Sequence, residues 1–323
     1  MSRLTSNTNP RTRRLLLSLA RIAISAGLLA WVFSRSGVRA LLDPVKGADL
    51  RFLAMAYALA VAGMLIRTVR WRILLTAVGA KVSFKRLLYL YFVGGFFNVF
   101  LPTGLGGDVV RVLEIGPGAT SEQAAGTVLV DRLAGFVALF VMALAALPFA
   151  SGLLPPGLAL AIGLLAGGVC LGAVLLFEGR ILPRLTARLP ARLSLDSGGW
   201  LGRTYAVITL CGARAIWGAL GVSAVYNLSV IWAGVFVARA FGLQVSAWYF
   251  LLFIPITVLA LLVPISIGGL GVRESIYVTL FGQVGLTAAQ ATVLSLGVYS
   301  LDVVTGLVGG GLYLVAGLRG LRR

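Results

Sequence analysis

Long apolar runs recur along the whole sequence and constrain its fold more than any other feature. Most are close to 20 residues long, which is enough for a helix to cross about 30 Å of hydrocarbon. Hydrophobic residues make up 59% of the chain and charged residues only 12%, whereas a soluble domain carries about 25% charged residues. We therefore predict an all-α polytopic membrane protein with about eight hydrophobic helical segments, at 15–33, 52–69, 87–101, 124–149, 156–177, 215–238, 248–265 and 289–318.

Lys and Arg are concentrated in some of the connecting segments, and the chain has a formal net charge of +18. Cytoplasmic loops of membrane proteins are enriched in these residues. We therefore predict a multi-pass protein of the cell (inner) membrane with both termini in the cytoplasm. The segments placed on the cytoplasmic side are the tail 1–14, the loops 67–86 and 178–214, and the tail 319–323.

The same basic residues indicate which partners to expect. A basic surface favours anionic lipid headgroups. Nucleic acid is not expected, because the sequence has no basic patch interleaved with aromatic residues. The second apolar run ends in Arg67, Arg70, Trp71 and Arg72, and we interpret these residues as a basic and aromatic belt at the membrane interface.

The loops at 150–155 and 239–247 carry almost no Lys or Arg, so they are placed outside. The segments 87–123 and 248–288 must then each begin and end on one side of the membrane. This count predicts six full spans and two re-entrant hairpins of opposite direction. The alternative is eight full spans. In either case residues 15–318 form a single transmembrane domain, with halves at about 15–150 and 156–318.

A motif occurs twice, once in each predicted hairpin. Pro, Gly-Gly and Val-Arg recur at identical spacing with an offset of 162 residues, at Pro102, Gly106, Gly107, Val110 and Arg111 and again at Pro264, Gly268, Gly269, Val272 and Arg273. Opposed hairpins with matching motifs are what an inverted repeat would produce. In many transporters such repeats place broken helices and the substrate site near the membrane midplane.

The first copy, "LPTGLGGDVVR", explains why polar residues follow an apolar run. Pro102 lacks an N–H and breaks the helix, and Gly106 and Gly107 allow close backbone approach. Asp108 is expected to cap a new helix that runs to about Ile115. The first amides of that helix would suit an anion, and Arg111 would add a guanidinium suited to phosphate.

Each candidate residue also has a structural interpretation. Arg111 could pair with Asp108 or Glu114, Glu274 with its neighbour Arg273, and Asp131 with its neighbour Arg132 near the inner interface. Asn98 could link helices. Asp302 lies well inside an apolar run, where a lone carboxylate is costly and usually functional, and an arginine of a hairpin is its expected partner. The candidate substrate-binding residues are Asn98, Gly106, Gly107, Asp108, Arg111, Glu114, Asp131, Arg132, Gly268, Gly269, Arg273, Glu274 and Asp302.

No cofactor or metal is expected. The chain has no histidine, the commonest metal ligand and general base. Cys170 and Cys211 are isolated and form no CxxC pair. No nucleotide-binding P-loop is visible either.

Three segments, "NVFLPTGLGGDVVR", "VDRLAG" and "PISIGGLGVRE", resemble the transmembrane region of the lysylphosphatidylglycerol synthase family, often called flippase-like. The similarity extends from about 15 to 318. In that family the membrane region is associated with moving aminoacylated phosphatidylglycerol across the bilayer, and a cytosolic synthase domain transfers the amino acid. The resemblance therefore implies a lipid transporter. We do not expect such a domain within these 323 residues, and therefore do not expect lipid aminoacylation. Stand-alone relatives are associated with various lipids.

We therefore expect a flippase-like transporter of a phospholipid or other lipid-linked phosphate, with the headgroup held at the two Pro/Gly/Arg helix breaks. Enzymatic activity is not expected. The alternative is a membrane enzyme or glycosyltransferase-associated subunit that acts on a lipid phosphate. A separate lipid-modifying enzyme and a homo-oligomer remain open as partners.

Overall fold

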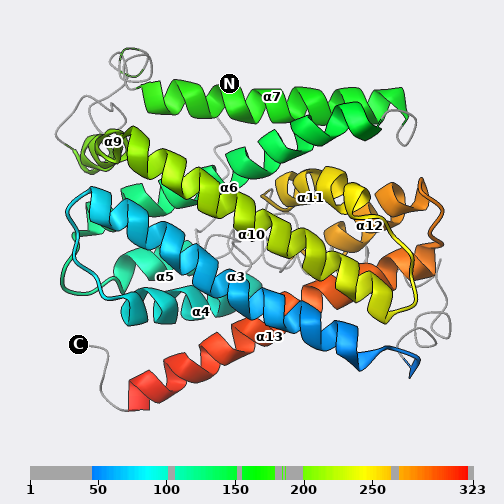
Figure 1. Cartoon of the computed structure of the whole chain (residues 1–323). Coiled ribbons are helices and arrows are strands. Elements are labelled where there is room, and N and C mark those ends of the chain that lie inside the picture. Colours follow the sequence, from blue (N-terminus) through cyan, green and yellow to red (C-terminus); the bar gives the residue numbers. More distant parts are fainter. Residues whose placement is uncertain are drawn as a thin grey trace, which may run out of the picture.

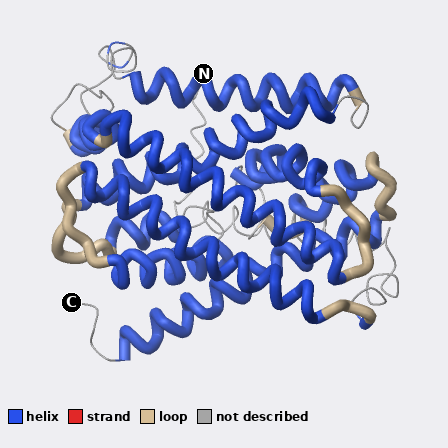
Figure 2. The backbone as a smooth tube through the Cα atoms, viewed as in Figure 1, coloured by secondary structure: helices blue, strands red, loops and turns tan. Residues whose placement is uncertain are grey.

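The computed structural model describes residues 46–100, 106–150, 155–178, 199–262 and 269–318, together with Arg184 and Thr186. Helices account for most of these residues, and there is no strand among them (Figures 1 and 2). The first predicted span at 15–33, both tails, and the motif residues Pro102, Pro264 and Gly268 lie outside the described residues.

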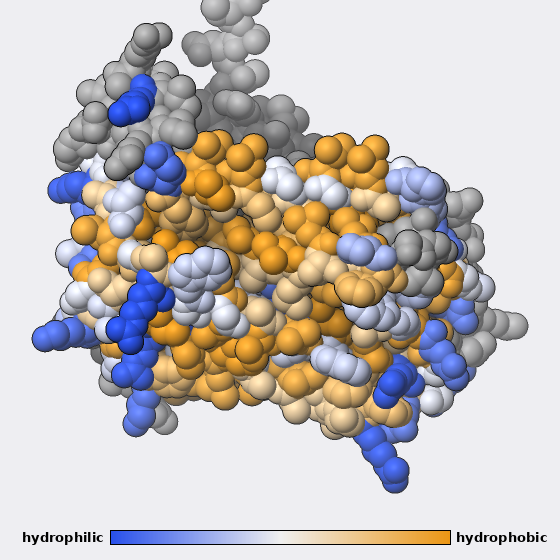
Figure 3. Space-filling model, turned by 45° about the horizontal axis from the view of Figure 1, so that its top comes forward, coloured by the Kyte–Doolittle hydropathy of each residue, from blue (hydrophilic) through white to orange (hydrophobic). Residues whose placement is uncertain are grey.

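Five helices of the described chain are long and apolar enough to cross a membrane. They are α3 (Leu50–Ala77), α6 (Ser121–Ala146, continued by the 3-10 helix η1, Leu147–Ala150), α7 (Pro156–Glu178), α10 (Gly212–Ala240) and α13 (Ala288–Leu318). Figure 3 shows an apolar surface over the middle of one face, with hydrophilic residues mainly towards the two ends. The prediction of a helical, multi-pass membrane protein is confirmed at this level.

Shorter helices form two hairpins. In the first, α4 (Phe84–Phe100) is followed by α5 (Gly106–Leu113). The backbone of Gly107 contacts Gly94, and Arg86 near the start of α4 donates to the Glu114 carbonyl just after α5. These contacts make α4 and α5 antiparallel. The 17 residues of α4 extend about 26 Å at 1.5 Å per residue, which is shorter than the hydrocarbon thickness.

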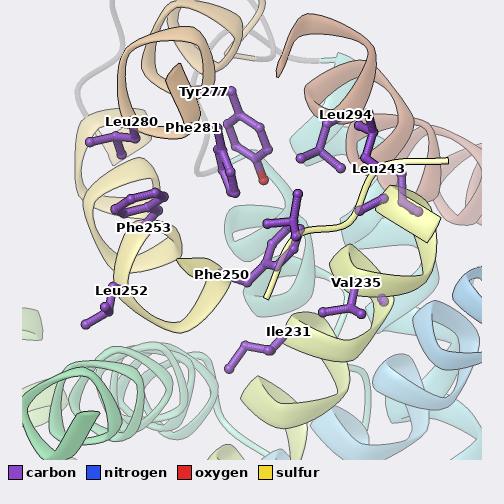
Figure 4. Packing of buried hydrophobic residues seen from close by; sticks show 14 of the residues in the cluster. Ile231, Val235, Leu243, Phe250, Leu252, Phe253, Tyr277, Leu280, Phe281 and Leu294 are labelled. Atoms are coloured by element: carbon purple, nitrogen blue, oxygen red, sulfur yellow. The ribbon is translucent and has the colours of Figure 1, made fainter. Parts of the chain in front are cut away.

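The second hairpin consists of α11 (Ala247–Leu262) and α12 (Val272–Gly282). Aromatic side chains join its two arms. The ring of Phe281 lies 5.2 Å from that of Phe250 and 5.1 Å from that of Phe253, and Tyr277 packs beside it at 5.0 Å (Figure 4). These rings belong to the largest buried apolar cluster of the described chain.

The two hairpins belong to a repeat of four helices. When 162 is added to each residue number, α3, α4, α5 and α6 fall on or near α10, α11, α12 and α13. The offset that relates the two sequence motifs therefore also relates the order of these eight helices. It reproduces the bounds of α10 and α11 closely, whereas α12 and α13 begin further along the chain than it predicts. The helices α7 and α9 (Trp200–Leu210) lie between the two copies in the sequence.

The first helices of the two copies pack against each other in opposite directions, as the colours of Figure 1 show for α3 and α10. At one end the Asp49 amide donates to the Ala240 carbonyl over 2.9 Å. In the middle Gly63 faces Tyr226, and further along Gly218 faces Ile73. The first helices of the two copies are therefore antiparallel along their length.

The crossing of α4 and α13 requires glycine. A Cβ at Gly309 would collide with the Phe92 carbonyl, and a Cβ at Gly310 would come within 2.7 Å of the Phe96 ring. These contacts bring the hairpin of the first copy directly against the last helix of the second.

Two sequence predictions need correction. The second apolar run was predicted to end at residue 69, but α3 continues to Ala77. The reason is that the residues beyond Arg72 are again good helix formers, up to Gly79 with its positive φ of 78°. The segment 178–214 was predicted as a loop, but part of it forms α9, whose Tyr205 and Ile208 pack into an apolar cluster.

Candidate functional site

The polar residues of the first motif are placed by the α4–α5 hairpin. Asn98, near the end of α4, accepts a hydrogen bond from the Gly107 amide over 2.9 Å. This contact confirms the linking role considered for Asn98, and it occupies one of the first amides of α5. Asp108 was expected to cap α5 but lies within its first turn, because the helix already begins at Gly106. Its carboxylate is used in ion pairs instead.

Asp131 on α6 is the centre of a buried polar network. One carboxylate oxygen accepts from Arg70 Nε of α3 over 2.6 Å. The other accepts from the Tyr91 hydroxyl over 2.6 Å and pairs with an Arg111 guanidinium nitrogen at 3.1 Å. The exposed fractions of Arg70, Arg111 and Asp131 are 4%, 3% and 1%. A carboxylate this deep is stable because each oxygen has a cationic partner.

Asp108 extends the network. It pairs with Arg111 at 3.2 Å and with Arg132 at 2.7 Å. The Arg111 guanidinium carbon also lies 4.1 Å from the centre of the Trp71 ring and 4.0 Å from that of Tyr91. We call Arg67, Arg70, Asp108, Arg111, Asp131 and Arg132 the arginine cluster; these residues come from α3, α5 and α6.

The arginine cluster overturns two interpretations made from the sequence. Asp131 pairs with Arg70 and Arg111, not with its neighbour Arg132, which pairs with Asp108. Consecutive residues of a helix point in different directions, so they seldom meet. Arg70 and Trp71 are not exposed, as the side chains of an interface belt would be, but are buried between helices, and the Trp71 ring nitrogen donates to Thr127 over 3.1 Å.

The second motif has a simpler arrangement. Arg273 on α12 pairs with Asp302 on α13 at 3.3 Å, so the expected pairing of Asp302 with a hairpin arginine is confirmed. Arg273 also lies 4.8 Å from the centre of the Tyr299 ring. The Asp302 side chain is 58% exposed and Arg273 only 14%. Asp302 is therefore the open side of this ion pair, and it borders the cavity described below.

Glu274 has a different partner from the one considered. It is fully buried, and its carboxylate accepts from the Gly271 amide at the start of α12 and from the Ser295 hydroxyl. The local ion pair with Arg273 is thus replaced by a helix-capping role. Gly269, with a φ of 76°, begins the turn into α12. In the first copy, Glu114 follows α5, and its carbonyl accepts from Arg86 over 2.6 Å.

A cavity of about 230 Å³ lies between the two copies of the repeat. Its walls come from α3, α10, α11, α12 and α13 and are mainly apolar. The charged residues on its surface are Arg67, Arg273 and Asp302. A cavity with long apolar walls and a few charged groups suits an amphipathic ligand.

Arg67 was not among the candidates from the sequence. It lies between two aromatic rings, 4.9 Å from the centre of Tyr91 and 5.4 Å from that of Tyr226. One signal was available: Arg67 and Arg70 are one helical turn apart, and apolar residues continue after them without Gly or Pro until Gly79. This pattern favours two arginines inside a helix over two arginines after its end.

Nucleophilic and metal chemistry have no visible centre in the described residues. No group of three or more acidic or cysteine side chains is placed there to hold a metal. Cys170 and Cys211 are free thiols. Burial raises the pKa of Cys211 to about 11, so this residue stays a protonated, weakly nucleophilic thiol at neutral pH.

Comparison with known proteins agrees with this architecture. A sequence model of the family described as the lysylphosphatidylglycerol synthase TM region matches residues 18–310. The chain belongs to this family. The match includes both motifs, all residues of the arginine cluster and all of the repeat except the end of α13.

Two curated relatives are named as membrane proteins. A UPF0104 membrane protein of Pyrococcus horikoshii is 26% identical over 142 residues, which is 43% of this chain and 41% of the relative. A UPF0104 membrane protein of Methanothermobacter thermautotrophicus is 30% identical over 99 residues, 31% of this chain and 27% of the relative. The chain thus matches less than half the length of these two members, and their names state no activity.

Proposed function

We propose that this protein is a flippase-like transporter that moves a phospholipid or another lipid-linked phosphate between the leaflets of the cell membrane. The observation that carries the proposal is the cavity between the two copies of the repeat. Its apolar walls suit an acyl or prenyl chain, and Arg67, Arg273 and Asp302 supply charged groups for a headgroup. Substrate sites of inverted-repeat transporters commonly lie at the interface of the repeats.

The membrane arrangement of the hairpins is part of the proposal. The short helices α4 and α11, each followed by an antiparallel shorter helix, suit segments that enter and leave the membrane on one side. With the apolar run at 15–33, which lies outside the described residues, the five long helices would give six full spans. The eight hydrophobic segments of the sequence then correspond to six spans and two hairpins.

The two motif arginines are proposed to serve the headgroup in different conformations. Arg273 lines the cavity and has one carboxylate partner, whereas Arg111 is held by Asp108 and Asp131 and does not line it. In the arrangement described here, Arg273 is therefore the motif arginine that meets the phosphate. Arg111 would do so only after its two carboxylates release it.

Arg273→Gln is expected to lower lipid movement in reconstituted liposomes on the order of tenfold, because a charge-assisted hydrogen bond to phosphate contributes about 1.5–3 kcal/mol. The measurement follows fluorescent phospholipids that become accessible to a membrane-impermeant quencher. Arg273→Lys retains the charge but loses the planar fork, so partial activity is expected. Arg214→Gln, an exposed arginine at the start of α10, is the matched control.

Unchanged transport in Arg273→Gln would contradict the proposed headgroup contact. A chemically altered lipid in the wild-type liposomes would instead support the enzyme alternative. Of the three carboxylates that such an enzyme could use, Asp108, Glu114 and Glu274, the first and the last already have partners in the fold.

Both termini are expected to face the cytoplasm. An even number of spans with hairpins that return to their own side requires the two ends to share a compartment, and the excess of arginine at both ends favours the inner side. The location of each end is measured with two reporters fused at residue 1 or at residue 323. One reporter is active only in the cytoplasm and the other only outside it. Opposite signals from the two ends would refute the count of six spans and two hairpins.

A further inference from the structure

The arginine cluster contains more positive than negative charge. Three guanidinium groups, Arg70, Arg111 and Arg132, pair with two carboxylates, Asp108 and Asp131, and a fourth, Arg67, lies over the Tyr91 ring of the same network. Arginine stays protonated at physiological pH, so the cluster has a net charge of +2. A positive charge without a counter-ion is costly between membrane helices.

The excess is not spread evenly over the cluster. Arg70 and Arg111 both pair with Asp131, and Arg111 and Arg132 both pair with Asp108. Among the described residues, Arg67 has no carboxylate within ion-pair distance. Its neighbours are the faces of Tyr91 and Tyr226, which stabilise a cation but do not neutralise it.

Arg67 is also the member of the cluster that reaches the cavity. The two other charged groups on the cavity surface, Arg273 and Asp302, form an ion pair with each other. The cavity therefore presents one uncompensated positive charge, at Arg67. Its remaining surface is largely apolar, with Leu59 and Ala60 two turns earlier on α3 and Ile254, Val258 and Leu261 opposite on α11.

We propose that Arg67 binds a singly charged anionic lipid headgroup, a phosphodiester without a compensating ammonium, while the apolar cavity wall takes the lipid chain. The assignment rests on the proposed function and names the charge class of its substrate. The two tyrosines hold the guanidinium in place. The Asp131 network fixes Tyr91, because the Tyr91 hydroxyl donates to the same carboxylate oxygen that pairs with Arg111.

The charge class follows from the single uncompensated charge at the cavity, that of Arg67. The second excess charge of the cluster is shared by Arg70, Arg111 and Arg132 with their two carboxylates. A zwitterionic headgroup would leave the charge on Arg67 neutralised only in part, since its ammonium group would be brought into the same cavity. An anion without a chain would leave the apolar wall uncovered. A monoanionic phospholipid meets both requirements.

The test measures binding of short-chain lipids to the purified protein in detergent by isothermal titration calorimetry. The probes are dihexanoyl phosphatidylglycerol, dihexanoyl phosphatidylcholine and inorganic phosphate. Wild-type protein is expected to bind the phosphatidylglycerol at least tenfold more tightly than either of the others. Arg67→Gln should lose at least tenfold in affinity for phosphatidylglycerol, and Arg67→Lys should keep most of it. Arg72→Gln, an exposed arginine of the same helix, should bind as wild type.

Equal affinity of the wild type for the two lipids would overturn the proposal, and so would unchanged binding by Arg67→Gln. Equal affinity for inorganic phosphate would overturn the assignment to a lipid. If Arg67→Gln does not fold, the proposal is judged from the affinities of the wild type and of Arg67→Lys for the three probes. If phosphatidylglycerol binds through Arg67 but no lipid moves across the liposome membrane, the transport function is refuted and the binding site is not. If lipid moves and Arg67→Gln still binds phosphatidylglycerol as the wild type does, the binding site is refuted and the transport function is not.

Discussion

Replacing Asp131 with asparagine should destabilise the protein by about 3–5 kcal/mol, the usual cost of removing one partner from a buried ion pair. Asp131 accepts three hydrogen bonds, from Arg70, Tyr91 and Arg111, and is 1% exposed. The neutral amide would leave Arg70 without an anionic partner inside the bundle. The expected observations are a sharply reduced yield of monodisperse protein and a melting temperature lowered by several degrees.

Glu122→Gln is the matched control for this prediction. Glu122 lies on the same helix and also pairs with an arginine, Arg203, but that arginine side chain is 61% exposed. Surface ion pairs contribute about 0–1 kcal/mol, so the control should melt close to the wild type. If Asp131→Asn melted like Glu122→Gln, the carboxylate would not be the buried anchor of α3, α5 and α6.

Gly309→Ala should separate α13 from α4 and abolish both stable folding and lipid movement. An added Cβ would overlap the Phe92 carbonyl oxygen, and backbone cannot yield as a flexible side chain does. Overpacking a core typically costs about 1–3 kcal/mol, and more where no rotamer can relieve it. The measurement is thermal unfolding by intrinsic fluorescence together with the elution profile in detergent.

The same helix provides the control for this change. A Cβ at Gly311 would meet nothing within 4 Å, so Gly311→Ala should fold and melt as well as the wild type or slightly better, since alanine favours helix over glycine by about 1 kcal/mol. If both alanine variants behaved alike, the close crossing of α4 and α13 would not be a determinant of the fold.

The long apolar segments could be predicted from the sequence with useful accuracy. The run at 156–177 corresponds to α7, Pro156–Glu178, and the run at 289–318 to α13, Ala288–Leu318. Segment length and composition determine these helices, because a chain in lipid must satisfy its backbone hydrogen bonds internally. The offset of 162 found in two short motifs also proved to relate two sets of four helices.

The ion-pair partner of a charged residue could be predicted from the sequence only where few residues of opposite charge were available to it. Asp302 was correctly assigned to an arginine of the second hairpin. Asp131 was not, since one of its partners, Arg70, lies 61 positions away on a helix whose last turns were taken for a loop. Nearness in sequence favoured Arg132, but the direction in which a helical side chain points is fixed by the backbone.

The sequence by itself determined that this chain is a helical membrane protein and that it contains a repeated Pro/Gly/Arg motif. It also showed that few charged residues lie inside the apolar segments, which marked those residues as candidates for a functional role. Those properties follow from local composition and spacing. Only the tertiary structure decided that Arg111 is enclosed by two carboxylates and two aromatic rings, and that Arg67 is the arginine left facing the cavity without a carboxylate. Charge compensation depends on which side chains from distant helices meet, and packing of α3 against α6 and α10 sets those distances.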